Sequence, residues 1–147
     1  MARIDYYDIE KELQYILQGD PALNEVTVLI EEMPEMTADM APFVSIFIDR
    51  REVPSAQPIA GGTRQRMLLK LSLWCYVVEM ESVESACKKR DDLIGKVEIA
   101  LMNNRTINDK VNHTIMDGGE FDNVSLQTIG LAMGGSIVLL VDVSGIS

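Results

Sequence analysis

The spacing of apolar residues predicts a helix near the N-terminus, over residues 4–19. Four apolar side chains stand at i, i+4, i+7 and i+8 and share one stripe of such a helix: Ile9, Leu13, Ile16 and Leu17. Gly19 suits the C-terminal cap, and Pro21 cannot continue a helix. An amphipathic helix of this kind needs a partner surface to cover its apolar stripe.

Alternation with a period of two predicts the first strands, at residues 25–31 and 43–49, separated by a proline-bearing loop at 32–42. The second strand carries apolar side chains on both of its faces: Val44, Ile46 and Ile48 on one, Phe43 and Phe47 on the other. This pattern is typical of a strand that is buried on both sides.

The middle of the chain is predicted to hold a long loop followed by a long strand. Residues 50–63 contain two prolines and two glycines and show almost no periodicity, whereas residues 64–80 alternate throughout. A strand averages about 5–6 residues, so part of this one should project past the core. Its projecting end carries Arg64, Arg66 and Lys70.

Residues 83–102 show the helical period more fully than any other segment, and Ser82 suits the N-cap. Two pairs of opposite charges at i,i+4 spacing stabilise the solvent-facing side of this helix: Glu84 with Lys88, and Asp92 with Lys96.

The remainder of the chain reads as β-rich. A short strand is expected at His113–Asp117, followed by a turn at Gly118-Gly119 and an irregular strand at 121–132. Gly134-Gly135 matches a tight hairpin turn, and residues 136–143 form a final apolar strand.

This order of elements predicts one α+β domain over residues 1–147. Each helix needs a surface to cover, and the simplest solution is a single mostly antiparallel or mixed β-sheet with both helices packed on one face. The long strand adds a projecting β-hairpin.

Charge divides the chain into unlike segments. The formal net charge is −10, which argues against a nucleic-acid binder and against attraction to an anionic membrane. Residues 1–49 have a net charge of −9, residues 50–70 have +4, and residues 71–147 have −5. Opposite charges of this kind can join like subunits. The candidate interface residues are Arg50, Arg51, Arg64, Arg66 and Lys70; the alternative is that these side chains only solvate a loop.

The sequence offers no clear catalytic or metal-binding constellation, and we expect no enzyme, cofactor or metal. His113 is the only histidine, and a lone histidine with no nearby cysteine cannot complete a zinc site. Cys75 and Cys87 fall on apolar faces, where thiols are inert. The glycine pairs fit no phosphate-binding loop.

Two clusters of acidic residues and one cluster of methionines each allow a structural and a functional interpretation. The acids Glu31, Glu32 and Glu35, and likewise Glu79, Glu81 and Glu84, could form acid–base pairs, but solvated faces explain them better. The three methionines of the 32–42 loop suggest an interaction surface, because methionine adapts to irregular contacts: Met33, Met36 and Met40.

The pattern resembles the tail terminator family of tailed bacteriophages over residues 4–143. The resemblance rests on the helix ending near Gly19-Asp20-Pro21, the strand Pro42–Ile48, the loop through Gly61-Gly62-Thr63-Arg64, the long strand Met67–Val78, the helix from Ser82 and a closing hairpin strand.

The resemblance implies a non-catalytic virion protein that forms a homo-hexameric ring on the head-proximal end of the tail tube. The ring would stop tube growth and dock the head's connector. Its implied partners are therefore copies of itself, the tail tube protein, a head-completion or connector protein and, in a contractile tail, the sheath protein. The genome DNA would pass through without specific binding.

The expected location is the virion tail or neck, after assembly in the host cytoplasm. The N-terminus lacks the apolar run of a signal peptide, and no stretch reaches the roughly 18 apolar residues of a membrane helix. Two alternatives stay open: another phage neck or head-completion subunit, and a small ligand-binding regulatory α+β module.

Overall fold

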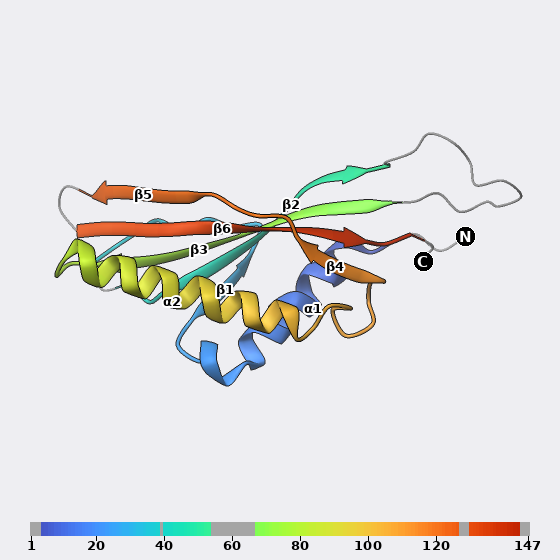
Figure 1. The fold of residues 1–147 in the computed structure, drawn as a ribbon, viewed down its shortest axis with the longest axis horizontal. Helices are drawn as coiled ribbons and strands as arrows, with labels where there is room; N and C mark the ends of the chain where they lie inside the picture. Colours follow the sequence, from blue (N-terminus) through green and yellow to red (C-terminus); the bar gives the residue numbers. More distant parts are fainter. Residues whose placement is uncertain (1–3, 39, 54–66, 127–129, 145–147) are drawn as a thin grey trace, which may run out of the picture.

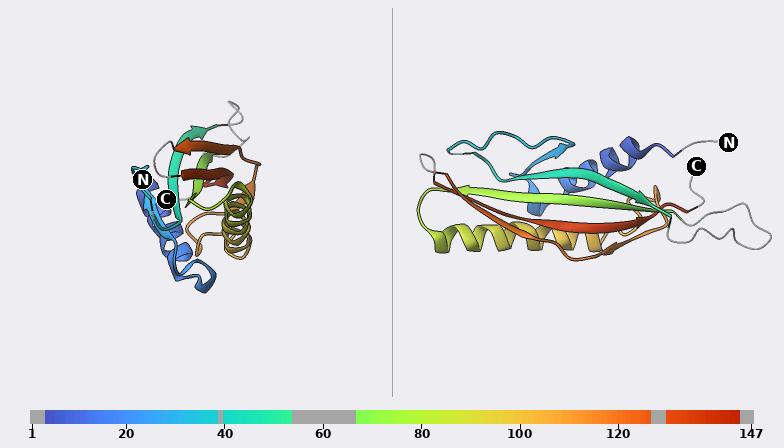
Figure 2. Two further views of the ribbon diagram at one scale, coloured as in Figure 1. Left: turned by 90° about the vertical axis from the view of Figure 1, so that its left-hand side faces the viewer. Right: turned by 90° about the horizontal axis from the view of Figure 1, so that it is seen from above.

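The computed structural model describes residues 4–38, 40–53, 67–126 and 130–144. Within them, two long helices lie on one side of a curved mixed sheet (Figures 1 and 2). The elements are α1 (Tyr6–Gly19), the short 3-10 helix η1 (Pro21–Leu23), β1 (Thr27–Ile30), β2 (Phe43–Glu52), β3 (Leu68–Glu79), α2 (Val83–Met102), β4 (His113–Met116), β5 (Phe121–Leu126) and β6 (Gly130–Asp142). The expected α+β fold is confirmed.

The sheet has the order β1-β2-β3-β6-β4, and β5 also pairs with β6. β1 runs parallel to β2, and the other pairs are antiparallel. β6 is long enough to hold β5 along its first half and β4 along its second half, so one strand carries two edge strands in tandem.

The core lies between the sheet and the two helices. Alternate residues of the three central strands face the helices and are almost completely buried: Val44 and Ile46 in β2; Leu69, Leu71, Leu73 and Cys75 in β3; Ile137, Leu139 and Val141 in β6. The helices supply the facing layer with Ile9, Leu13 and Leu17 from α1 and Leu93, Val97, Ala100 and Leu101 from α2. Burial of this apolar area is the main favourable term in folding.

Side-chain caps fix both helix starts. Asp5 accepts a hydrogen bond from the Asp8 backbone N–H at 3.0 Å, and Ser82 accepts one from Ser85 at 3.1 Å. The α2 prediction is confirmed, including its Glu84–Lys88 and Asp92–Lys96 ion pairs at 3.1 and 2.8 Å. No helix in the described ranges is both long enough and apolar enough to cross a membrane.

The C-terminal cap of α1 differs from the prediction. Gly19 is the last helical residue, and Asp20 caps the helix in an extended conformation, donating its backbone N–H to the Leu17 carbonyl. The chain leaves without a left-handed turn, so a glycine is not required there. Asp20 then caps η1 by accepting from Ala22 at 2.9 Å.

The predicted hairpin turn at Gly134-Gly135 is wrong. Both glycines lie inside β6, opposite Tyr76 and Cys75 of β3. A Cβ atom on Gly134 would lie 2.4 Å from Cδ1 of the Tyr76 ring, so glycine here provides space for a neighbouring side chain rather than a turn. Residues 130–132, assigned by the sequence to the preceding strand, also belong to β6. The link between β5 and β6 falls at 127–129, outside the described residues.

The predicted turn at Gly118-Gly119 is also wrong, because the chain does not reverse there. It follows β6 from β4 to β5 through hydrogen bonds between Asp117 and Val138 and between Glu120 and Ser136. A Cβ atom on Gly119 would lie 1.7 Å from the Ser136 carbonyl oxygen, and Gly118 has φ +91°. The two glycines let the edge chain cross close over its neighbour.

An aromatic row closes part of the sheet face opposite the helices. Phe43 and Tyr76 stack with ring centroids 5.4 Å apart, and Trp74 lies 6.2 Å from Tyr76. The Tyr76 ring passes over Gly134, and its hydroxyl donates to Asp122 at 2.5 Å. Burial and this hydrogen bond raise the pKa of Tyr76, so the ring links β2, β3, β6 and β5 as a neutral phenol.

We predict that Gly134→Ala destabilises the fold by about 1–3 kcal/mol, because the added methyl group overlaps the Tyr76 ring and the backbone of β3. Urea unfolding followed by circular dichroism measures the change. Gly95→Ala is the matched control: it lies within α2 with open space around it, and should stabilise by about 0.5–1 kcal/mol. Equal stability of Gly134→Ala and the unmodified protein would contradict the account.

Candidate functional site

Three of the five predicted interface residues lie on an arm formed by the outer ends of β2 and β3. The sequence assigns residues 50–52 to a loop, but β2 continues through Glu52 and stays paired with β3. Figure 1 shows both strands running past the C-terminal end of α2. Arg64 and Arg66 lie outside the described residues.

Strand pairing brings Arg50 and Lys70 together. They are direct register partners, just beyond an irregularity in the pairing between Ile48 and Arg50. Asp49, at this irregularity, accepts a hydrogen bond from the Ser72 hydroxyl. Two basic side chains that are far apart in the sequence therefore share one face of the arm.

Arg50 is held only at the surface. Its Nε lies 3.1 Å from Oε1 of Glu52, and its side chain is 64% exposed. Exposed ion pairs typically contribute about 0–1 kcal/mol, so the Arg50 guanidinium can exchange Glu52 for a better-placed partner at little cost.

Arg51 points to the opposite side of the arm, toward α1. Its guanidinium lies 5.8 Å from the centre of the Tyr6 ring, and its Nη1 donates to the Tyr6 hydroxyl at 3.5 Å. The Tyr6 hydroxyl in turn donates to the sulfur of Met67 at 3.8 Å. The contact with Tyr6 raises the pKa of Arg51. The arm thus carries basic side chains on both faces.

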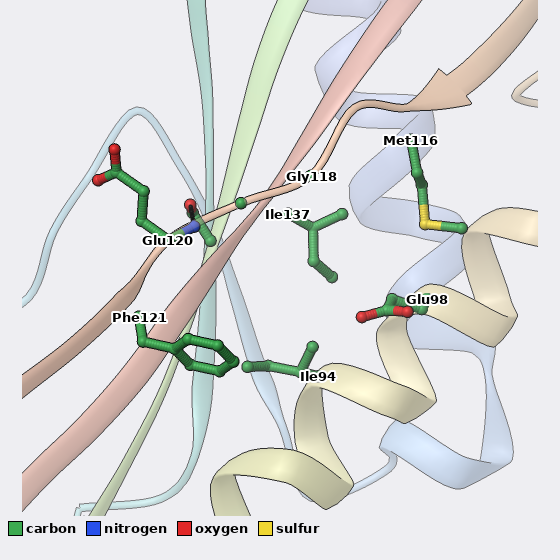
Figure 3. A pocket seen from close by; sticks show the side chains of 9 residues that line it. Ile94, Glu98, Met116, Gly118, Glu120, Phe121 and Ile137 are labelled. Atoms are coloured by element: carbon green, nitrogen blue, oxygen red, sulfur yellow. Dashed lines mark hydrogen bonds between the residues drawn. The ribbon is translucent and has the colours of Figure 1, made fainter.

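A second candidate surface is a hollow of about 290 Å³ between α2 and the edge chain that links β4 to β5 (Figure 3). Its walls are mainly apolar and come from Ile94, Met116, Phe121 and Ile137. The carboxylate of Glu98 faces into it between Ile94 and Met116, whereas the side chain of the exposed Glu120 points away from it, to the other side of the edge chain. We call this site the α2–edge hollow.

The charges at the α2–edge hollow are unbalanced. Among the described residues, Glu98 takes part in no ion pair. The nearby base, Arg90, lies 4.7 Å from the centre of the Phe121 ring and already pairs with Asp91 at 3.0 Å. The hollow therefore combines apolar walls with free negative charge.

Sequence reasoning missed this hollow. Glu98 belongs to a regular helical pattern and reads as an ordinary solvent-facing residue, while the glycine pair Gly118-Gly119 reads as a turn. Only the straight passage of the chain from β4 to β5 brings Phe121 beside α2.

The histidine and the two cysteines that the sequence offers for catalysis do not form a reactive cluster in the described part of the chain. His113 is exposed at the start of β4, and no three metal-ligating side chains cluster in the part of the chain that the structure describes. Cys75 is fully buried; burial, and to a lesser extent the charge of Glu98, raise the pKa of its thiol to about 12. Cys87 donates its thiol to Met133 at 3.7 Å.

Glu79 corrects the expectation of a solvated acidic face. Only 6% of this residue is exposed. Its carboxylate pairs with Lys89 and accepts hydrogen bonds from the Ser85 hydroxyl and the backbone N–H groups of Met80 and Glu81 at 3.0–3.2 Å. These contacts, with Lys89 first, lower the pKa of Glu79 to about 2. The carboxylate fastens the end of β3 to the start of α2.

Glu10 is a second buried acid, on α1, with only 3% of its surface exposed. Burial raises its pKa to about 8, with smaller contributions from hydrogen bonding and repulsion with Glu31. Glu31 has φ +53° and accepts the backbone N–H of Ile48 at 2.9 Å. Glu10 is therefore mainly protonated at neutral pH.

No family model matches this chain, and no curated protein matches it in sequence. Solved structures of several other chains do align with it, and two of them cover most of its length. A chain from the virion of a native gene transfer agent particle shares 12% identity at a TM-score of 0.49, covering 92% of this chain and 94% of that one.

A second is the sheath/tube terminator of an extracellular contractile injection system, PVC, in its extended state. It shares 17% identity at a TM-score of 0.46; the alignment covers 97% of this chain but 58% of the terminator's length. With both TM-scores below 0.5, neither alignment decides the function of this chain.

We predict that Glu79→Gln lowers stability at pH 7 and that the loss shrinks as the pH falls. The folded-state pKa of about 2 lies below the ordinary value of 4.5, so the stabilisation is complete above pH 4.5 and disappears toward pH 2. Urea midpoints at pH 7, 4.5 and 2.5 measure the trend. The control is Glu84→Gln, in an exposed pair, with an expected change of about 0.5 kcal/mol or less.

We predict the opposite pH trend for Glu10. Its folded-state pKa of about 8 exceeds 4.5, so its contribution is complete below pH 4.5 and is lost as the pH rises through 8. Glu10→Gln should flatten the decline in melting temperature between pH 5 and 9, because an amide does not ionise. Glu25→Gln, at an exposed position, should keep the decline. A decline of the same size in Glu10→Gln would show that other groups cause it.

Proposed function

We propose that this chain is a structural subunit that assembles with copies of itself into a ring at the head-proximal end of a phage-type tail tube. In this role it ends tube growth and presents a docking surface to the head's connector. The proposal rests on the sequence resemblance to tail terminators, together with one observation: basic side chains of β2 and β3 lie together at one end of the sheet of an otherwise acidic domain.

Unlike surfaces on one subunit support a closed ring. A head-to-tail contact requires two different patches, one fitting the other, and a rotation that closes. The arm carries Arg50, Arg51 and Lys70, whereas the rest of the chain carries a large excess of acids. Like subunits with this distribution attract one another when an arm meets the body of the next copy.

A non-catalytic role agrees with the way the shifted titratable groups are used. Strongly shifted pKa values often mark active sites, but structural ion pairs also produce them. Here Glu79 fastens β3 to α2, Cys75 lies in the core and Tyr76 crosses the sheet to Asp122. Each shift has a structural cause.

The proposed partners are the tail tube protein, a head-completion or connector protein and, in a contractile tail, the sheath protein. DNA would pass through the ring without being read, since a net negative wall does not retain a polyanion. The proposed location is the virion neck.

We predict that the purified protein forms hexameric rings as its concentration rises, and that Arg50→Glu with Lys70→Glu raises the concentration for half-assembly at least tenfold. Charge reversal on the arm replaces attraction by repulsion, and added salt should reduce the difference. Size-exclusion chromatography with light scattering measures the mass, and electron microscopy with tail tubes locates the ring.

The control reverses two exposed lysines away from the arm, Lys11→Glu with Lys88→Glu, and should assemble as the unmodified protein does. A strict monomer at every concentration, with and without tubes, contradicts the proposal. Binding to a connector without binding to a tube identifies a different neck subunit instead.

A further inference from the structure

We propose that the α2–edge hollow is the receptor for the basic arm of a second copy of this chain, with Arg50 as the side chain that enters it. This inference rests on the proposed function, because it names the two surfaces that meet between neighbouring subunits.

The chemistry of the hollow selects a long basic side chain. Arginine and lysine bury an apolar stem while the charged head keeps a polar partner. The α2–edge hollow offers Ile94, Met116 and Ile137 to the stem and the carboxylate of Glu98 to the head (Figure 3).

The hollow has room for a long side chain. Its volume of about 290 Å³ lies at the lower end of the range of about 300 to 1,000 Å³ that is typical of pockets for drug-sized molecules. Phe121 stands at one end with 70% of its surface exposed and adds apolar area that an incoming strand can cover.

The arm has the matching composition. Among the described residues, Arg50 forms an ion pair only with the half-buried Glu52, and Val53, which follows β2 directly, has 47% of its surface exposed. A basic and apolar arm is therefore opposite in charge to the acidic and apolar hollow. Oppositely charged patches of this kind speed association and fix the register of the contact.

Topology prevents an arm from reaching the hollow of its own subunit. Arg50 shares a face of the sheet with its register partner Lys70, while the adjacent Leu69 lies in the core under the helices. The hollow lies on the helix side, beside α2 and Ile137. Arg50 and Glu98 thus lie on opposite faces, and a contact between them must join two copies.

A contact between unlike surfaces repeats. Each subunit would offer one arm to the next copy and one hollow to the previous copy, which is the head-to-tail arrangement that closes into a ring. The Arg50–Glu98 contact would be repeated at each interface.

Charge exchange tests the inference. Glu98→Lys, and separately Arg50→Glu, should each raise the concentration for half-assembly at least tenfold in light scattering at low salt. The combined variant with both changes should recover at least most of the loss, since every interface then carries the reversed pair. Glu32→Lys makes the same change in net charge as Glu98→Lys at an exposed position outside the hollow and should assemble normally.

Circular dichroism melting must show that each variant is folded, and Glu98→Gln provides a milder change with an intermediate expected loss. Assembly of the unmodified protein together with unchanged assembly of the Glu98 variants overturns the inference but leaves the proposed function standing. Failure of the combined variant to recover also overturns it. A lack of assembly by the unmodified protein overturns the proposed function itself.

Discussion

The pairing of β3 with β6 is the interaction on which the rest of the structure depends. It runs without interruption from Leu68 opposite Asp142 to Glu79 opposite Leu131. β2 joins one side of this pair, and β4 and β5 join the other. The alternate side chains of the pair form the floor on which both helices rest. The arm and the α2–edge hollow are therefore placed by the same two strands.

The periodicity of apolar residues predicted the elements whose structure depends only on spacing along the chain. The stripe of α1, the full length of α2 with its Ser82 cap, and the unusual length of β3 follow from spacing alone. The prediction of turns failed at glycines that are required by a contact with a residue distant in the sequence. Gly134 and Gly119 are glycines because the Tyr76 ring and the Ser136 carbonyl occupy the space of a side chain, and no local pattern records such a contact.

The candidate interface could likewise be predicted only in part. Clustered charge is visible in a sequence, so the basic residues of the arm could be named in advance. Their opposite faces could not, because the irregularity after Ile48 and the contact of Arg51 with Tyr6 depend on strand pairing. The α2–edge hollow could not be predicted from the sequence, because its walls come from a helix, an edge chain and a central strand that are far apart in the sequence.

The arm is a continuation of the sheet, and this gives it mechanical properties that an attached loop would lack. A pull on its tip along β3 passes into hydrogen bonds with β2 on one side and β6 on the other. These bonds lie across the direction of the pull, so they are loaded together in shear instead of opening one after another. A subunit joined to its neighbours through such an arm transmits tension directly into its most extensively bonded strands.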